Sequence, residues 1–244
     1  MLNFAFGSIG IIIAISILFL FFIRYISNEK LHLFTVIISF VFFLLMISNL
    51  ISVVYSIFYE IFEPSNMLVS TIFYIILQVT AYLVGTLMVF RLITKEELEK
   101  GLALYIGYGI GLFEVYLNSI SAAITNLTIY AYAESNELLS VLTEQYGANS
   151  ANALYQQYMQ SPKLYMTYIT ITALASLIVI LSFTMALHKA QTSKNKKHMV
   201  IAVAILLIFK LLFQVLPLAG YGWAVVGMIA VVVAATFCMI YYVM

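Results

Sequence analysis

Residues 33–59 read LFTVIISFVFFLLMISNLISVVYSIFY, and this stretch contains no charged side chain. At 1.5 Å per residue a helix of this length extends about 40 Å, which exceeds the roughly 30 Å of hydrocarbon in a bilayer. The strands of a membrane β-barrel would be about ten residues long and would alternate in polarity, and this stretch does neither. It therefore predicts a transmembrane α-helix.

The rest of the chain has the same apolar character. It has 244 residues, of which 64% are hydrophobic and 9% charged, whereas a soluble domain is about 45–50% apolar and 25% charged. We therefore predict an all-α, polytopic membrane bundle of seven transmembrane helices that forms a single domain, 1–244. The seven apolar runs are 8–26, 33–59, 69–93, 102–129, 164–188, 199–216 and 223–244.

Charge sets the expected partners and orientation. The net charge of +1 excludes electrostatic binding of nucleic acid and leaves membrane lipid as the constant partner. Cytoplasmic loops collect Lys and Arg, which predicts an N-terminus outside the cell membrane and a cytoplasmic C-terminus. Nine of the eleven cations flank the first, third and fifth loops, namely Arg24, Lys30, Arg91, Lys95, Lys100, Lys189, Lys194, Lys196 and Lys197.

One loop, 130–163, is long enough to carry structure of its own. Leu138 and Leu142 recur at helical spacing after Ser135, a residue type that often begins a helix. We expect an external helical loop, in the form of a short hairpin on the outer membrane face. It either binds a partner or peptide or simply closes the bundle.

Two ionisable residues lie near the middle of predicted spans, where a charge is costly and indicates a functional site. Glu114 lies 12 residues into the span that begins at 102, and Lys210 lies 11 residues into the span that begins at 199. Both helices run in the same direction, so the two depths are about 18 Å and 16 Å. We predict a buried Glu114–Lys210 ion pair, which either fixes helix register or lines a path for a substrate or proton.

Polar residues near this pair predict a polar interior at mid-depth. Spacing of four, three and four residues places Glu114, Asn118, Ser121 and Thr125 on one helix face. Beyond the ion pair, the expected polar layer contains side chains that either join helices or line a pathway. They are Asn118, Gln214, Gln78 and Asn49.

The same span carries Gly107 and Gly111 on its cytoplasmic side. Their spacing is that of the GxxxG motif, in which small residues let a second membrane helix approach closely. We therefore interpret the two glycines as a helix-packing contact and not as part of a ligand site.

The residues needed for familiar catalysis are missing from the predicted spans. His32, His188 and His198 all lie at or beyond span ends, there is no Asp, and Cys238 is the one cysteine. A metal site needs at least three such ligands together, so we predict no catalytic residue, no metal and no cofactor. One alternative is a serine–lysine dyad in which Lys210 activates a serine within a span. The candidate serines are Ser119, Ser121 and Ser176.

Residues 107–114, GYGIGLFE, resemble the G-x-G-H-G-G-x-E stretch of the YhfC family of intramembrane metalloproteases, which is related to the CAAX-protease-like group. The resemblance implies about seven helices and a late helix of the form Ala-x-x-x-His, where this chain reads AILLIFK over 204–210. It also implies a lost metal site. Ile110 stands where the family has His, residues 81–91 contain no acid, and Lys210 lies near the last family His.

The leading hypothesis is therefore a non-catalytic, pseudoprotease-like membrane protein that binds a hydrophobic peptide or a partner membrane protein. Such a protein would be an accessory or immunity subunit of an exporter. A small-solute transporter, or its membrane subunit, is the alternative that a polar site at mid-bilayer favours. An active protease of unusual chemistry is the third hypothesis.

Overall fold

The structure, a computed structural model, describes residues 2–28, 30–62, 67–94, 99–134, 140, 143–144 and 162–243. All elements in these residues are helical, which confirms the all-α prediction for this part of the chain. In chain order they are α1 (Leu2–Ser27), α2 (Leu33–Phe42), the π-helical turn η1 (Phe43–Ile47), α3 (Ser48–Phe62), α4 (Met67–Ile93), α5 (Lys100–Val115), the π-helical turn η2 (Tyr116–Ile120), α6 (Ser121–Glu134), α9 (Pro162–Ser193), α10 (Lys196–Val215), the 3₁₀ turn η3 (Leu216–Ala219) and α11 (Tyr221–Val243).

Six helical segments are long and apolar enough to cross a membrane, as in a multi-pass membrane protein. They are α1, the α2–η1–α3 segment, α4, α9, α10 and α11. The α5–η2–α6 segment, which corresponds to the predicted span 102–129, is not among the six. It contains Glu114, Asn118 and several glycines, and these residues lower its mean hydropathy.

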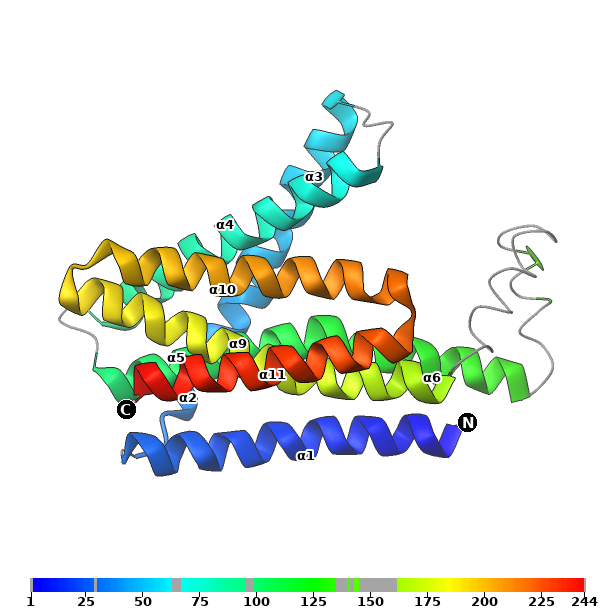
Figure 1. The fold of residues 1–244 in the computed structure, drawn as a ribbon, viewed down its shortest axis with the longest axis horizontal. Coiled ribbons are helices and arrows are strands. Elements are labelled where there is room, and N and C mark those ends of the chain that lie inside the picture. Colours follow the sequence, from blue (N-terminus) through cyan, green and yellow to red (C-terminus); the bar gives the residue numbers. More distant parts are fainter. Residues whose placement is uncertain are drawn as a thin grey trace.

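Helix α9 forms the centre of the bundle. About 83% of its apolar segment is buried, against 17% to 44% for the other five segments. It packs against α1, α5, α10 and α11, which run along it with similar axes (Figure 1). Its side chains are buried on every face because protein surrounds the helix, and small hydroxyl residues such as Ser176 and Thr184 are buried among the apolar ones.

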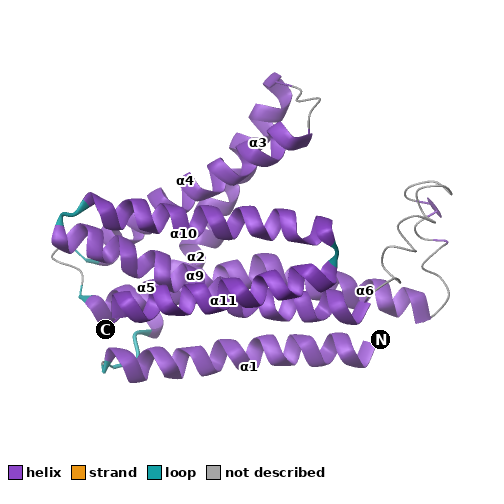
Figure 2. Cartoon of the chain, viewed as in Figure 1, coloured by secondary structure: helices purple, strands orange, loops and turns teal. Residues whose placement is uncertain are grey.

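Helices α3 and α4 form a hairpin that leaves this bundle. Figures 1 and 2 show α3 and the first half of α4 projecting together away from the other helices. Aromatic rings join the two helices. Phe58 and Phe73 are stacked with centroids 3.7 Å apart, and Tyr55 and Tyr74 meet edge to face with centroids 5.0 Å apart. The second half of α4 returns to the bundle and packs against α10.

The π-helical turn η2 changes which residues face inward after Glu114. Ser121 and Thr125 are exposed, so the predicted polar stripe stops at this turn. A π turn contains one residue more than an α turn, so the side chains that follow are rotated by about 100°. The buried positions then fall one or two residues later than the α-helical pattern predicts. The buried residues beyond Asn118 are Ser119, Ala123, Asn126 and Tyr130.

The predicted external helical loop, 130–163, lies mostly outside the described residues. Helix α6 continues into it as far as Glu134, and α9 begins at Pro162. The hairpin expected between these two helices therefore stays a prediction.

Candidate functional site

Glu114 and Lys210 form an ion pair in the interior of the bundle. Lys210 Nζ lies 2.5 Å from Glu114 Oε1, and the two side chains are 2% and 0% exposed. Helix α5 supplies the acid and α10 the base, so the contact joins helices that are 96 residues apart in sequence. The predicted pairing is present, and it matters because an isolated charge at this depth would be strongly destabilising.

Two further side chains complete the environment of the carboxylate. The hydroxyl of Tyr82 donates a hydrogen bond to Glu114 Oε2, and Asn118 Nδ2 donates one to Oε1. Lys210 Nζ also lies 4.7 Å from the centroid of the Tyr82 ring, within range of a cation–π interaction. We call Glu114, Lys210, Tyr82 and Asn118 the polar cluster. Three donors from three segments satisfy one carboxylate, which is the arrangement that a buried charge requires.

Aromatic rings surround the polar cluster. The Phe43 ring centroid lies 5.1 Å from that of Tyr82, and the Phe113 ring centroid lies 5.8 Å from that of Phe43. Phe43 is the first residue of η1, and Asn118 lies within η2. Both π-helical turns therefore contribute to the cluster, and π turns are frequent at functional sites.

Tyr82 was not among the residues that the sequence pattern predicted for this site. It lies four residues after Gln78 and eight after Tyr74, so all three share one face of α4. This spacing of polar and aromatic side chains in an apolar span is the signal that would have indicated Tyr82.

The other residues predicted for the polar interior differ in where their side chains lie. Gln78 is buried, as expected for a polar interior. Gln214 lies one turn beyond Lys210, is partly buried, and makes no hydrogen bond to the described members of the polar cluster. Asn49 is exposed, and its Nδ2 donates to the Leu45 carbonyl of its own helix at 2.5 Å. The assignment of Asn49 to the interior is therefore wrong, because α3 projects away from the bundle beyond η1.

Glycines let α5 approach two helices closely. A Cβ on Gly107 would lie 3.0 Å from Thr184 Cβ, and one on Gly111 would lie 3.2 Å from Leu177 Cδ2, both on α9. Gly107 and Gly111 are thus packing contacts. Gly109 faces the opposite side, where a Cβ would lie 2.5 Å from the backbone carbonyl oxygen of Val36 on α2.

The chemistry available inside the bundle is limited. Among the described residues, no three His, Cys, Asp or Glu side chains come together as a possible metal site. The buried hydroxyls of Ser119 and Ser176 have no hydrogen-bond partner in the described structure, and neither bonds to Lys210. Lys210 instead donates to Glu114, so the serine–lysine arrangement is not formed.

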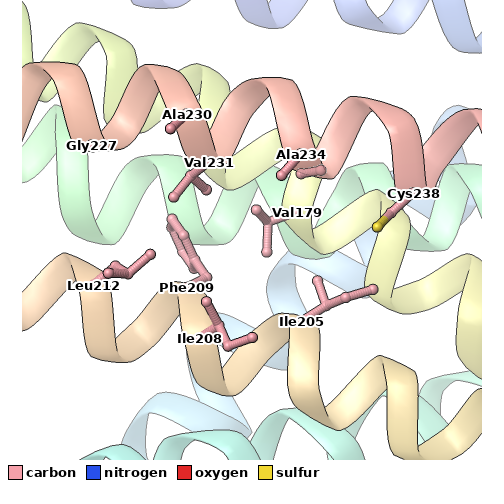
Figure 3. A pocket seen from close by; sticks show the side chains of 11 residues that line it. Val179, Ile205, Ile208, Phe209, Leu212, Gly227, Ala230, Val231, Ala234 and Cys238 are labelled. Carbon is pink, nitrogen blue, oxygen red and sulfur yellow. The ribbon is translucent and has the colours of Figure 1, made fainter.

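An apolar groove lies between α10 and α11, with a volume of about 440 Å³. Figure 3 shows Phe209 and Val231 facing each other across it, with Val179 of α9 between the two helices. We call it the α10–α11 groove. Its lining residues are Val179, Ile205, Ile208, Phe209, Leu212, Gly227, Ala230, Val231, Ala234, Ala235 and Cys238.

Small residues form the α11 wall of this groove. Gly227, Ala230, Ala234 and Cys238 are separated by three, four and four residues, so they lie in one stripe along the helix. On α10, Phe209 lines the groove while the next residue, Lys210, enters the polar cluster. Helix α10 therefore connects the two features.

No protein-family model, curated protein sequence or solved structure matches this chain.

Proposed function

We propose that this chain is a non-catalytic integral membrane protein that binds an apolar helical segment in the α10–α11 groove. The segment belongs to a partner membrane protein or to a hydrophobic peptide. The observation that supports this proposal is the stripe of small residues Ala230, Ala234 and Cys238, which extends about 12 Å along α11. The space beside Gly227 is filled by Leu216 of the turn η3. Small side chains allow the backbone of a second helix to approach closely, and an acyl chain has no need of them.

In this proposal the polar cluster is a lock that holds α10 in position. Lys210 anchors one face of α10 to Glu114, and the adjacent face with Phe209 and Leu212 then forms a wall of the groove. The three donors already bound to Glu114 favour this structural role over metal ligation. If the resemblance to the YhfC family is real, the Lys210 ammonium takes the place of the metal, and the chain is a pseudoprotease suited to an accessory or immunity role beside an exporter.

The proposed topology has seven spans, with α5–η2–α6 as the fourth, in the cell membrane. Two observations support it. The N- and C-termini lie at opposite ends of the bundle (Figure 1), as an odd number of crossings requires. Nearly all of α5 is buried, so protein and not lipid surrounds the polar residues of this span. The basic loops support an orientation with the N-terminus outside and the C-terminus in the cytoplasm.

The alternative is a small-solute transporter, and the buried Glu114–Lys210 pair is the observation that favours it. The two functions differ in what Lys210→Met does. If the chain is a transporter, this substitution abolishes solute uptake while the protein still folds. If the ion pair is structural, the substitution lowers the free energy of unfolding.

Cys238 offers a direct test of the groove, since it is the single cysteine and lines the groove. We would attach a benzophenone maleimide to it in native membranes, irradiate, and identify the adducts by mass spectrometry. We expect one protein or peptide that is crosslinked through an apolar segment. The matched control is Val233→Cys in a Cys238→Ser background, because Val233 is an exposed residue of the same helix, outside the groove.

Two outcomes would contradict the proposal. Adducts to lipid alone from Cys238 would mean that the groove is filled by acyl chains. An identical set of protein adducts from position 233 would mean that labelling reports crowding of the membrane and not a binding site.

A further inference from the structure

A second cavity, of about 300 Å³, lies where α5 and α10 begin and α9 and α11 end. Its lining is polar, unlike that of the α10–α11 groove, and comes from all four of these helices. The lining residues are Lys100, His188, Lys189, Thr192, His198, Tyr241 and Tyr242. We call it the basic pocket.

Contacts between the helix ends hold the basic pocket together. Lys100 Nζ donates to the backbone carbonyl of Val243, which ties the start of α5 to the end of α11. His198 Nδ1 and the Tyr242 hydroxyl lie 3.2 Å apart, which ties α10 to α11. Within α9, Thr192 donates to the His188 carbonyl at 3.1 Å. The lining side chains thus occupy defined positions on four helices.

The pocket offers donors and positive charge. Each lysine ammonium has three N–H donors, so Lys100 retains two after its bond to Val243. His198 keeps Nε2 outside its contact with Tyr242, and a neutral ring that accepts at Nδ1 donates from Nε2. None of the seven lining residues is a carboxylate, although Glu99 precedes Lys100 in the chain. Two ammonium groups, the His198 imidazole donor and the Tyr241 hydroxyl match an anion that has several acceptor oxygens.

The position of the pocket relative to the membrane narrows the choice of anion. It is built from the ends of membrane-crossing helices, and Tyr241 at its rim is 70% exposed. Tyrosines and basic side chains at span ends mark the level of the lipid headgroups. We propose that the basic pocket binds a phosphoryl group, carried either by an anionic phospholipid headgroup or by a soluble phosphate ester. This site shares no lining residue with the α10–α11 groove, so either proposal can fail without the other.

Lys189→Gln is the variant that tests the proposal, because Lys189 is exposed and its loss leaves the contacts of Lys100 and His198 intact. The matched control is Lys197→Gln, which removes the same charge from an exposed residue at the same end of the bundle that does not line the pocket. The probes are phosphatidylglycerol in phosphatidylcholine nanodiscs, with phosphatidylcholine alone as reference, and glycerol phosphate in solution. Native mass spectrometry measures how much of each probe the full chain retains.

We expect retention of phosphatidylglycerol that Lys189→Gln weakens about fivefold, as follows from about 1 kcal/mol per basic residue near a membrane surface. Lys197→Gln should retain the lipid like the unaltered chain. Glycerol phosphate that binds alone with the same sensitivity to Lys189→Gln would assign the site to a soluble ester and would equally support a phosphoryl pocket. Equal losses in the two variants, or no retention of either probe, would overturn the proposal.

Discussion

At the scale of single residues, the contact between α5 and α10 depends on one carboxylate, that of Glu114. Glu114 accepts hydrogen bonds from Lys210, Tyr82 and Asn118, and the aromatic rings beside it exclude water. In such an environment an ion pair is strong, but each partner alone is costly because it has no other source of solvation. The pair therefore fixes the relative positions of α5 and α10 more than it adds net stability.

We predict a strong coupling between Glu114 and Lys210. Lys210→Met or Glu114→Gln alone should destabilise the protein by about 3–5 kcal/mol, because each leaves one uncompensated buried charge. The double variant should recover most of that loss, since the glutamine is neutral, its carbonyl oxygen accepts from Asn118 and its amide can donate to the Tyr82 hydroxyl oxygen. Denaturant unfolding in detergent micelles measures the coupling free energy.

Lys163→Met is the control for this cycle. Lys163 is an exposed lysine at the start of α9, so its loss should change the free energy of unfolding by less than about 0.5 kcal/mol. A double variant that is as unstable as the sum of the two single variants would contradict the lock.

At the scale of elements, two π-helical turns and the glycines of α5 determine which faces meet. The turn η2 rotates α6 so that Ser119 and Asn126 are buried in place of Ser121 and Thr125. Gly109 brings α5 against the backbone of α2. Close approach of this kind is the usual source of affinity between membrane helices, because lipid is as apolar as the helices themselves.

We predict that Gly109→Ala lowers stability by about 1–3 kcal/mol, the cost of forcing an extra carbon into a packed interior. The added Cβ would meet the Val36 carbonyl oxygen at 2.5 Å, and a backbone atom cannot rotate away as a side chain can. Thermal unfolding in detergent measures the loss. Gly10→Ala in α1 is the matched control, since its Cβ would meet nothing within 4 Å, and it should be neutral or stabilising by about 0.5–1 kcal/mol. Equal behaviour of the two variants would refute close packing at Gly109.

At the scale of the whole molecule, one buried helix organises the others. Helix α9 contacts α1, α5, α10 and α11, and of these α1, α10 and α11 leave one side free of protein, whereas α5 is buried almost throughout. The free sides carry exposed large apolar residues, such as Leu18 of α1 at 66% and Phe237 of α11 at 69%. A lipid environment explains this surface, which a soluble protein could not expose without aggregating.

The proposed topology predicts opposite accessibility for two positions in intact cells. In a Cys238→Ser background, Ser140→Cys should react with a membrane-impermeant maleimide and Gln191→Cys should not, because the basic loop after α9 lies inside. Both positions are exposed, so burial in the protein cannot account for a difference. After permeabilisation both should react. The reverse pattern, or labelling of both in intact cells, would mean that the orientation is wrong.

The amino-acid pattern alone predicted the helical class and the approximate extents of the six apolar segments that are long enough to cross a membrane in the described residues. The interval 33–59, for example, became the continuous segment from Leu33 to Phe62, because hydropathy and length depend on composition and not on contacts. The sequence also predicted the pairing of Glu114 with Lys210, since two opposite charges at equal depth in the hydrocarbon core have few other partners. Only the tertiary structure decided that Tyr82 joins them, that Asn49 faces outward, and that Gly109 touches α2. These outcomes follow from the rotation of each helix about its axis and from the π-helical turns. Both depend on how neighbouring helices pack, so the regular spacing of apolar residues in the sequence does not reveal them.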